Sequence, residues 1–304
     1  MKIAVVGVGG VGGYFGGRLA QAGYDVTFVA RGATLEALRT KGLRVESIKG
    51  DLHLPHVKAT EKLTEEVDVV LMAVKAWQLE EATKAIASTN ATVVPMQNGI
   101  DAPTILANQF ANVLGGLCAI ISFIVEPGHI KHPASEPTVM FGELDNTRSE
   151  RAERLLEAFT KAGVNAEIPR DIHRSMWAKF LFITPLSAMG AITRVPVGAW
   201  RASSELRDLT TRALEEIVAL ARAQHIDLGE DAVAKTWERY DDLAPEATAS
   251  LQRDIMQGKR SELEAQLGAV VRVGRQHGIA TPVNAMLYHC LLPQERQASG
   301  NAGG

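Results

Sequence analysis

The stretch that decides the fold is Ile-Ala-Val-Val-Gly-Val-Gly-Gly-Val-Gly, residues 3–12. A run of apolar, partly β-branched residues leads here directly into glycines with the spacing G-x-G-x-x-G, at Gly7, Gly9 and Gly12. The first glycine permits a tight turn, the second lets a pyrophosphate approach the backbone, and the third lets the next helix pack closely against the strand. The pattern predicts a dinucleotide-binding loop between a buried strand and a helix.

The residues that follow the glycines support this prediction. We expect a helix from Tyr14 to Ala22 with a C-cap at Gly23, and then a second strand that ends at Ala30. The unpaired N–H groups of that helix and the positive end of its dipole would point at the phosphates. The whole loop, Gly7, Val8, Gly9, Gly10, Val11 and Gly12, is therefore predicted to bind the cofactor. The alternative is a glycine-rich structural turn without a ligand.

The end of the second strand indicates which dinucleotide is bound. An NAD site usually places Asp or Glu there, to hold the ribose 2′-hydroxyl. This chain has Ala30-Arg31-Gly32 at that point, and Asp25 comes too early, at the start of the strand. The planar guanidinium of Arg31 suits a 2′-phosphate, so the sequence favours NADP over NAD. A solvated loop cation is the alternative interpretation of Arg31.

Composition narrows the class of protein. A chain of 304 residues suggests two domains, and 46% hydrophobic with 22% charged residues is ordinary for a globular protein. The formal charge of −3 argues against non-specific nucleic-acid binding, which requires a basic surface. The first strand starts at the N-terminus and no apolar run is long enough to span a bilayer. We therefore expect a cytoplasmic protein without a signal peptide or membrane partner.

Cysteine and histidine give no sign of a metal or disulfide. Cys118 and Cys290 lie in apolar runs far apart in the sequence, so we expect two buried thiols. The histidines lack a convincing ligand set, and no metal is implied. His129 and His132 are expected as loop or surface residues.

The first half of the chain alternates strands with helices, which predicts a parallel sheet covered on both faces. Residues 115–141 are rich in β-branched residues and turn signals, and should form hairpins that close the first domain. A helix over Glu150–Ala162 then returns to it. The expected strands are Lys2–Val6, Asp25–Ala30, Val67–Ala73, Ala91–Pro95 and Val113–Val125, with helices between them such as Leu35–Lys41 and Gln78–Ala87.

The second half is predicted to be all-helical. Apolar residues recur there at spacings of three and four, as in Leu206, Leu209, Ala213, Leu214, Ile217 and Ala221, with almost no strand pattern. The fold class is thus an α/β Rossmann domain followed by a helical domain. We expect the boundaries 1–168 for the cofactor-binding domain, 169–296 for the helical domain and 297–304 for a disordered tail.

Four polar residues occupy positions that suggest chemistry. Lys75 and Asn98 follow the third and fourth strands, at the sheet edge where ligands of such folds bind; a surface lysine and an Asn-Gly turn are the alternatives. Lys179 lies in the apolar run Met-Trp-Ala-Lys-Phe-Leu-Phe-Ile, where a cation is costly unless paired, snorkelled or functional. Glu262 begins a long helix, and its spacing alone favours a carboxylate that interacts with the helix dipole.

Together these residues resemble the ketopantoate reductases (2-dehydropantoate 2-reductases). The resemblance runs from Met1 to about Leu292. The pieces that carry it are the glycine loop, Arg31, Lys75-Ala-Trp-Gln78, Gln97-Asn-Gly99, Trp177-Ala-Lys179, Ser250-Leu-Gln-Arg-Asp254, Glu262 with Gly268, and Gly278-Ile-Ala-Thr-Pro282.

The resemblance implies an activity and roles for these residues. NADPH would reduce the C2 carbonyl of a 2-oxo acid, ketopantoate being the best candidate, in a cleft between the two domains. Lys179 would be the general acid and Glu262 a hydrogen-bonding partner of the substrate. Ser250 would help bind the substrate carboxylate, Asn98 would lie beside the nicotinamide ribose and substrate, and Lys75 and Arg31 would contact the cofactor.

The chain also departs from the family pattern. Members of the family carry asparagines four and eight residues after the lysine, where this chain has Ile183 and Ser187. One polar group toward the substrate is lost and the other is shortened, although Thr184 could supply a hydroxyl if Pro185 distorts the helix. The departure leaves open a divergent reductase of another, more apolar 2-oxo acid.

Two alternative functions are also compatible with the sequence, and the sequence does not decide the oligomeric state. One is a β-hydroxyacid dehydrogenase, which typically has an asparagine where Ile183 stands. The other is a non-catalytic NADP-binding protein. We expect a homodimer, paired through apolar helices of the second domain.

Overall fold

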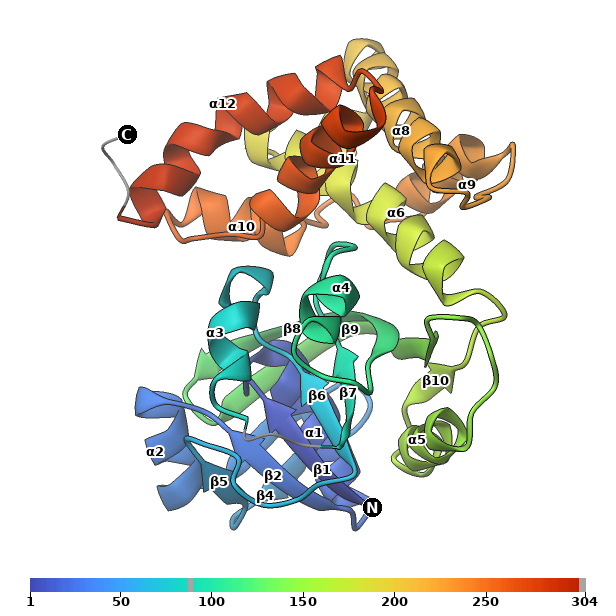
Figure 1. The fold of residues 1–304 in the computed structure, drawn as a ribbon. Coiled ribbons are helices and arrows are strands. Elements are labelled where there is room, and N and C mark those ends of the chain that lie inside the picture. Colours follow the sequence, from blue (N-terminus) through green and yellow to red (C-terminus); the bar gives the residue numbers. More distant parts are fainter. Residues whose placement is uncertain (87–89, 301–304) are drawn as a thin grey trace. The chain divides into compact units, whose positions relative to one another are not determined.

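A computed structural model describes residues 1–86 and 90–300 and divides the chain into two compact units. The first unit comprises Met1–Gln97 and Asp101–Ile172, and the second comprises Asn98–Ile100 and the chain from His173 onward (Figure 1). The main division lies four residues beyond the expected position 168. The short segment Asn98–Ile100 belongs with the second unit although it follows a strand of the first, which no local pattern in the sequence indicates.

The first unit is built on a five-stranded parallel sheet with the order β5-β2-β1-β6-β7. The chain moves outward from β1 through β2 to β5, and then returns to the other side of β1 for β6 and β7. The strand order thus reverses beside β1, and ligands of open α/β sheets bind outside the carboxyl ends of the strands at such a point. The strands are β1 (Lys2–Val6), β2 (Asp25–Val29), β5 (Lys58–Thr60), β6 (Val69–Met72) and β7 (Thr92–Pro95).

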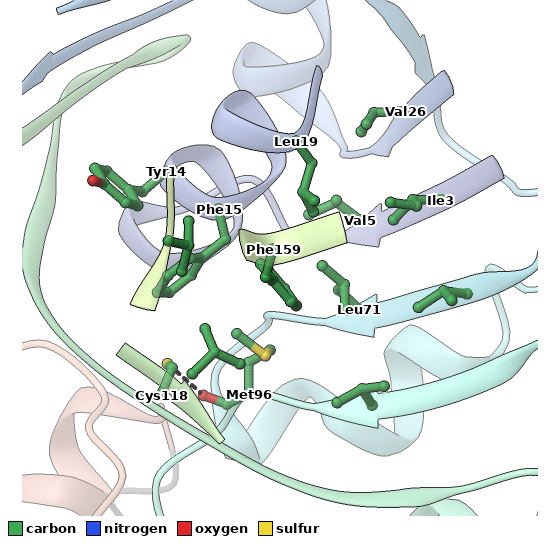
Figure 2. Packing of buried hydrophobic residues seen from close by; sticks show 14 of the residues in the cluster. Ile3, Val5, Tyr14, Phe15, Leu19, Val26, Leu71, Met96, Cys118 and Phe159 are labelled. Carbon is green, nitrogen blue, oxygen red and sulfur yellow. Dashed lines mark hydrogen bonds between the residues drawn. The ribbon is translucent and has the colours of Figure 1, made fainter. Parts of the chain in front are cut away.

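Both faces of this sheet are buried, which explains its continuous apolar runs. In β1, Ile3 and Val5 face a core that includes Phe15 and Leu19 of helix α1 (Figure 2), while the alternate residues of the strand face a separate apolar cluster. The helices of this unit are α1 (Gly10–Gln21), α2 (Gly32–Thr40), α3 (Leu79–Thr83), α4 (Ala102–Ala107) and α5 (Glu150–Lys161), with a 3₁₀ turn η1 (Ala76–Gln78).

A second sheet with the order β10-β9-β3-β4, in which β8 also pairs with β9, completes the first unit. The predicted hairpin is present: β8 and β9 run antiparallel around Gly128, which has a φ of +80°. The sequence did not predict β3, β4, β5 and β10, because short strands with charged residues carry little periodicity. This sheet consists of β3 (Leu43–Ser47), β4 (Leu52–Leu54), β8 (Leu114–Glu126), β9 (His129–Glu143) and β10 (Asn165–Glu167).

The second unit is helical throughout the part that the structure describes. Its core includes the predicted face of α8, where Ala213, Leu214 and Ile217 are fully buried. Its elements are α6 (Ile172–Thr193), α7 (Val197–Arg201), α8 (Ser204–Ala223), α9 (Ala232–Asp241), α10 (Ser250–Met256), a π-helical turn η2 (Glu264–Gly268), α11 (Ala269–His277) and α12 (Pro282–Ala298).

Helix α6 corrects one expectation from the sequence. By length and composition it is apolar enough to cross a membrane, whereas we expected no such segment. However, 67% of its most apolar window is buried within the protein. That environment is typical of a core helix.

Other expectations are also corrected by the structure. Helix α1 begins at Gly10, inside the glycine motif, and not at Tyr14. Cys290 is exposed, although Cys118 is buried as predicted. His129 and His132 are not loop residues: both lie in β9, and His132 is fully buried because β9 runs through the middle of its sheet. Helix α12 continues to Ala298, so the tail that we expected to be disordered from 297 is helical at Gln297 and Ala298. Residues 301–304 of that tail lie outside the described residues, as does Ala87, the last residue of the helix predicted from Gln78.

Candidate functional site

The glycine loop of the first unit has the geometry that its spacing predicts. Gly7 follows β1 with a φ of +93°, and a Cβ at this position would lie 2.6 Å from a methyl group of Val74. A Cβ on Gly12 would collide with the carbonyl oxygen of Gly7 and would approach Ala73, so only glycine lets α1 pack this closely on the strands. Both positions therefore need glycine for steric reasons, independently of any ligand.

The middle of the loop is open. Apart from Gly9 and its chain neighbours, no atom of the described residues lies within 4 Å of where a Cβ on Gly9 would be. Helix α1 has no acidic residue in its first turn that would compete with an anion. The two valines of the loop are packed inward, since Val8 is buried and Val11 is half-buried. The loop therefore offers backbone N–H groups and free space at the N-terminus of α1. This arrangement fits a dinucleotide diphosphate.

Arg31 lies exposed just beyond β2, as the N-cap residue of α2. The pKa of Glu81, in α3, is lowered by its hydrogen bond to Lys84 and, to a smaller extent, by the charge of Arg31. Arg31 thus lies on the side of α3, the helix that follows β6. Asp25 is at the other end of β2, 2.6 Å from the Nζ of Lys58, which lowers the pKa of Asp25.

The loops after β6 and β7, at the same edge of the sheet, each contain a glutamine whose side chain bonds to backbone groups. The backbone N–H of Lys75 donates to Oε1 of Gln78 at 3.2 Å. The Nε2 of Gln97, after β7, donates to the carbonyls of Met72 and Val74 at 2.7 and 3.0 Å. These bonds tie the end of β7 to the end of β6. The Oε1 of Gln97 is buried and has no hydrogen-bond partner among the residues that the structure describes.

In the second unit the structure brings together two of the predicted residues. Nδ2 of Asn98 donates a hydrogen bond of 3.0 Å to Oε2 of Glu262, 164 residues later in the chain. Gly99 has a φ of +104°, and a Cβ there would lie 2.7 Å from the carbonyl oxygen of Ala265. Asn98-Gly99 is therefore more than a turn, because glycine lets the loop lie against the backbone after Glu262 and lets Asn98 reach the carboxylate.

Glu262 does not stand in the first turn of a regular helix, as its spacing suggested. It is 5% exposed and stands two residues before the π-helical turn η2, in which the N–H of Gly268 donates to the carbonyl of Leu263. Single π turns occur frequently at functional sites. A buried carboxylate held by a side-chain amide beside such a turn has the features of a functional group rather than a helix cap.

The remaining candidates lie on helices α6 and α10 of the second unit. Lys179 is partly buried on α6, and Ile183, one turn later, packs against the helical core. Thr184 and Ser187 are almost completely buried, and neither hydroxyl has a partner within residues 1–86 and 90–300. Ser250 is the partly buried first residue of α10. The structure therefore buries both hydroxyls that the sequence offered beside Lys179.

Reasoning from the sequence missed one residue near the glycine loop. Ser122, in β8, lies against Gly10, and its buried Oγ has no partner among the described residues. The available signal was a lone hydroxyl in the apolar run Ile-Ile-Ser-Phe-Ile-Val.

Both halves of the chain are similar to known proteins. The family model described as ketopantoate reductase PanE/ApbA matches residues 3–146, and its C-terminal counterpart matches residues 171–295. A 2-dehydropantoate 2-reductase from Archaeoglobus fulgidus is 33% identical over 288 residues, which is 94% of this chain and 95% of that protein.

Two solved structures extend the comparison. The crystal structure of a PanE/ApbA family ketopantoate reductase from Ralstonia eutropha JMP134 matches with a TM-score of 0.89 at 28% identity, over 98% of this chain and 100% of that one. A D-mandelate dehydrogenase, solved with NADH and anilino(oxo)acetate, shares the fold with a TM-score of 0.90 at 21% identity, over 98% and 100% of the two chains.

Proposed function

Because the chain belongs to the ketopantoate reductase family, we propose that it uses NADPH to reduce the C2 carbonyl of a 2-oxo acid to a 2-hydroxy acid. The first candidate substrate is 2-dehydropantoate, which would place the enzyme in pantothenate biosynthesis. Family members are oxidoreductases that act on CH–OH groups and depend on NAD(P)H, and this chain is an oxidoreductase of that class. The observation that carries the proposal is the hydrogen bond between Asn98 and Glu262.

The choice of NADPH rests on Arg31. Its guanidinium follows β2 and can pair with a 2′-phosphate through two parallel hydrogen bonds. The only acidic residue of β2, Asp25, is at the opposite end of the strand and is paired with Lys58. No carboxylate of that strand therefore stands where NAD sites hold the ribose hydroxyls.

In the proposed mechanism, the glycine loop and Arg31 would hold the dinucleotide, which would supply a hydride for C2 of the substrate. Lys179 holds a proton for the carbonyl oxygen, which gains negative charge as the bond order falls, and an ammonium both stabilises that charge and transfers the proton. Glu262 accepts hydrogen bonds from the substrate, and Asn98 fixes the position of the carboxylate that does so. Ser250 would contribute a hydroxyl to the substrate carboxylate.

Ile183 favours a second candidate substrate. It stands one helical turn after Lys179 and presents an aliphatic side chain, while the hydroxyls of Thr184 and Ser187 are enclosed. A site with fewer polar groups beside the lysine suits a 2-oxo acid with an apolar substituent better than a hydroxylated one, because an unpaired substrate hydroxyl would lose its hydrogen bonds on binding.

The test is the loss of NADPH absorbance with 2-dehydropantoate, beside NADH and a series of branched and aromatic 2-oxo acids. The proposal expects turnover with at least one of these acids and a higher kcat/KM with NADPH than with NADH. The variant Lys179→Ala should lose turnover while its Kd for NADPH stays within about twofold. Turnover that survives this substitution would contradict the role of the lysine.

The proposal also includes a cytoplasmic homodimer that associates through helices of the second unit. Sedimentation equilibrium of the purified protein tests this part, and a single species at the monomer mass of 32.7 kDa would contradict it.

A further inference from the structure

The hydroxyl of Ser122 is a polar group without a hydrogen-bond partner in the part of the chain that the structure describes. Its Oγ is buried, and within residues 1–86 and 90–300 nothing donates to it or accepts from it. The residues around it in β8, Ile121 and Phe123, are apolar and exposed. Buried hydroxyls are almost always hydrogen-bonded in native proteins, so an orphaned one requires an explanation.

The position of Ser122 suggests one. A Cβ on Gly10, the first residue of α1, would lie 2.7 Å from the carbonyl oxygen of Ser122 and 2.9 Å from its Oγ. Because a C–C bond is about 1.5 Å long, the Oγ lies within about 4.5 Å of the Cα of Gly10. Strand β8 therefore passes directly over the first turn of α1. Any side chain at position 10 would push the two apart.

The pairing of β8 with β9 is irregular at this place. Ile121 pairs with Ala134 and Phe123 with Lys131, and the register shifts both before Ile121 and between Ile121 and Phe123. Opposite, Ser135 has a φ of +73°, and its hydroxyl accepts the N–H of Ile121 at 3.3 Å. Bulges of this kind re-aim side chains and occur often beside active sites. The distortion accompanies the approach of Ser122 to Gly10.

We propose that the Ser122 hydroxyl is a cofactor-binding group that donates a hydrogen bond to a diphosphate oxygen of the dinucleotide. This inference rests on the proposed function, which places the diphosphate at the N-terminus of α1. The open space at Gly9 admits the diphosphate, the N–H groups of α1 hold it from one side, and Ser122 closes the other. Rotation between staggered rotamers turns the hydroxyl toward the ligand without movement of the backbone.

The experiment measures Kd by equilibrium titration for two ligands, NADPH and 2′-phospho-ADP-ribose, which keeps the diphosphate but lacks the nicotinamide. The variants are Ser122→Ala, which removes the hydroxyl, and Ser122→Cys, which nearly keeps the side-chain volume but replaces the hydroxyl with a thiol, a weak donor. Loss of one hydrogen bond to a charged group should raise Kd about tenfold for both ligands. Should the alanine variant fail to fold, the cysteine variant carries the test.

The matched control is Ser149→Ala. Its hydroxyl caps α5 by accepting the N–H of Ala152 at 3.3 Å, and its loss should lower stability while leaving both Kd values unchanged. Unchanged Kd values for folded Ser122 variants would overturn the inference. A rise in Kd for NADPH alone would also overturn the inference, because the contact would then lie on the nicotinamide half of the cofactor. Wild-type protein that bound neither ligand would instead refute the proposed cofactor.

Discussion

The hydrogen bond between Asn98 and Glu262 should be measurable as a coupling in catalysis. The variant Asn98→Ala removes the amide that donates at 3.0 Å to the Glu262 carboxylate, a group that is only 5% exposed. A hydrogen bond to a charged group contributes about 1.5–3 kcal/mol, so kcat/KM should fall about 10–100-fold. In the Glu262→Gln background both partners of the hydrogen bond are neutral, and it contributes about 0.5–1.5 kcal/mol. Asn98→Ala should therefore lower kcat/KM only about 2–10-fold in that background.

The assay is a double-mutant cycle on kcat/KM with the oxo acid that the wild-type enzyme reduces best. Thermal unfolding and the Kd for NADPH are measured for each variant, to separate a local loss from a general one. Asn108→Ala, at an exposed asparagine after α4, is the matched control and should leave kcat/KM unchanged. If Asn98→Ala costs the same factor in both backgrounds, within about twofold, the two side chains are not coupled and the assigned geometry is wrong.

Two further predictions concern pH and cofactor choice. Burial lowers the pKa of His132, whose ring nitrogens lie 2.8 Å from Oγ of Ser47 and 3.2 Å from the carbonyl of Ser135. Below about pH 6.5 the unfolded chain therefore binds a proton that the native state does not, and stability falls as the pH drops toward the lower native pKa. Between pH 7.5 and 5.5, the free energy of unfolding measured in urea should fall less for His132→Gln than for wild type. Equal decreases for the two proteins would contradict this prediction. The control His56→Gln, at an exposed histidine, should behave like wild type. Arg31→Ala should raise the Kd for NADPH about 10–100-fold and that for NADH less than about threefold, and equal changes for the two cofactors would refute the pairing with the 2′-phosphate.

Much of the fold follows from local sequence. Glycine spacing after an apolar run identifies the strand, turn and helix because each glycine satisfies a steric need within a few residues, as Gly7 and Gly12 do. The alternating elements of the first half and the helical face of α8 follow from periodicity. The elements missed were short strands such as β5 and β10, which are stabilised by their neighbours in a sheet rather than by their own pattern.

The candidate site depended more on tertiary structure. The sequence pointed to Asn98 and Glu262 separately. The spacing of Glu262 alone favoured a carboxylate that interacts with the helix dipole, and only the family resemblance gave it a role toward the substrate. The fold joins the two side chains across 164 residues. The sequence also predicted His132 as a loop or surface residue, whereas it is buried in β9. No pattern in the sequence connected Ser122 with Gly10.

By itself, then, the sequence determined the class of fold and the glycine turn after β1, because backbone sterics and hydrophobic periodicity act over a few residues; the reactive side chains stay a prediction. The tertiary structure alone decided which polar groups meet, which are buried and which are left without a partner. Those outcomes depend on chain segments that are distant in sequence and come together only when the sheets and helices pack.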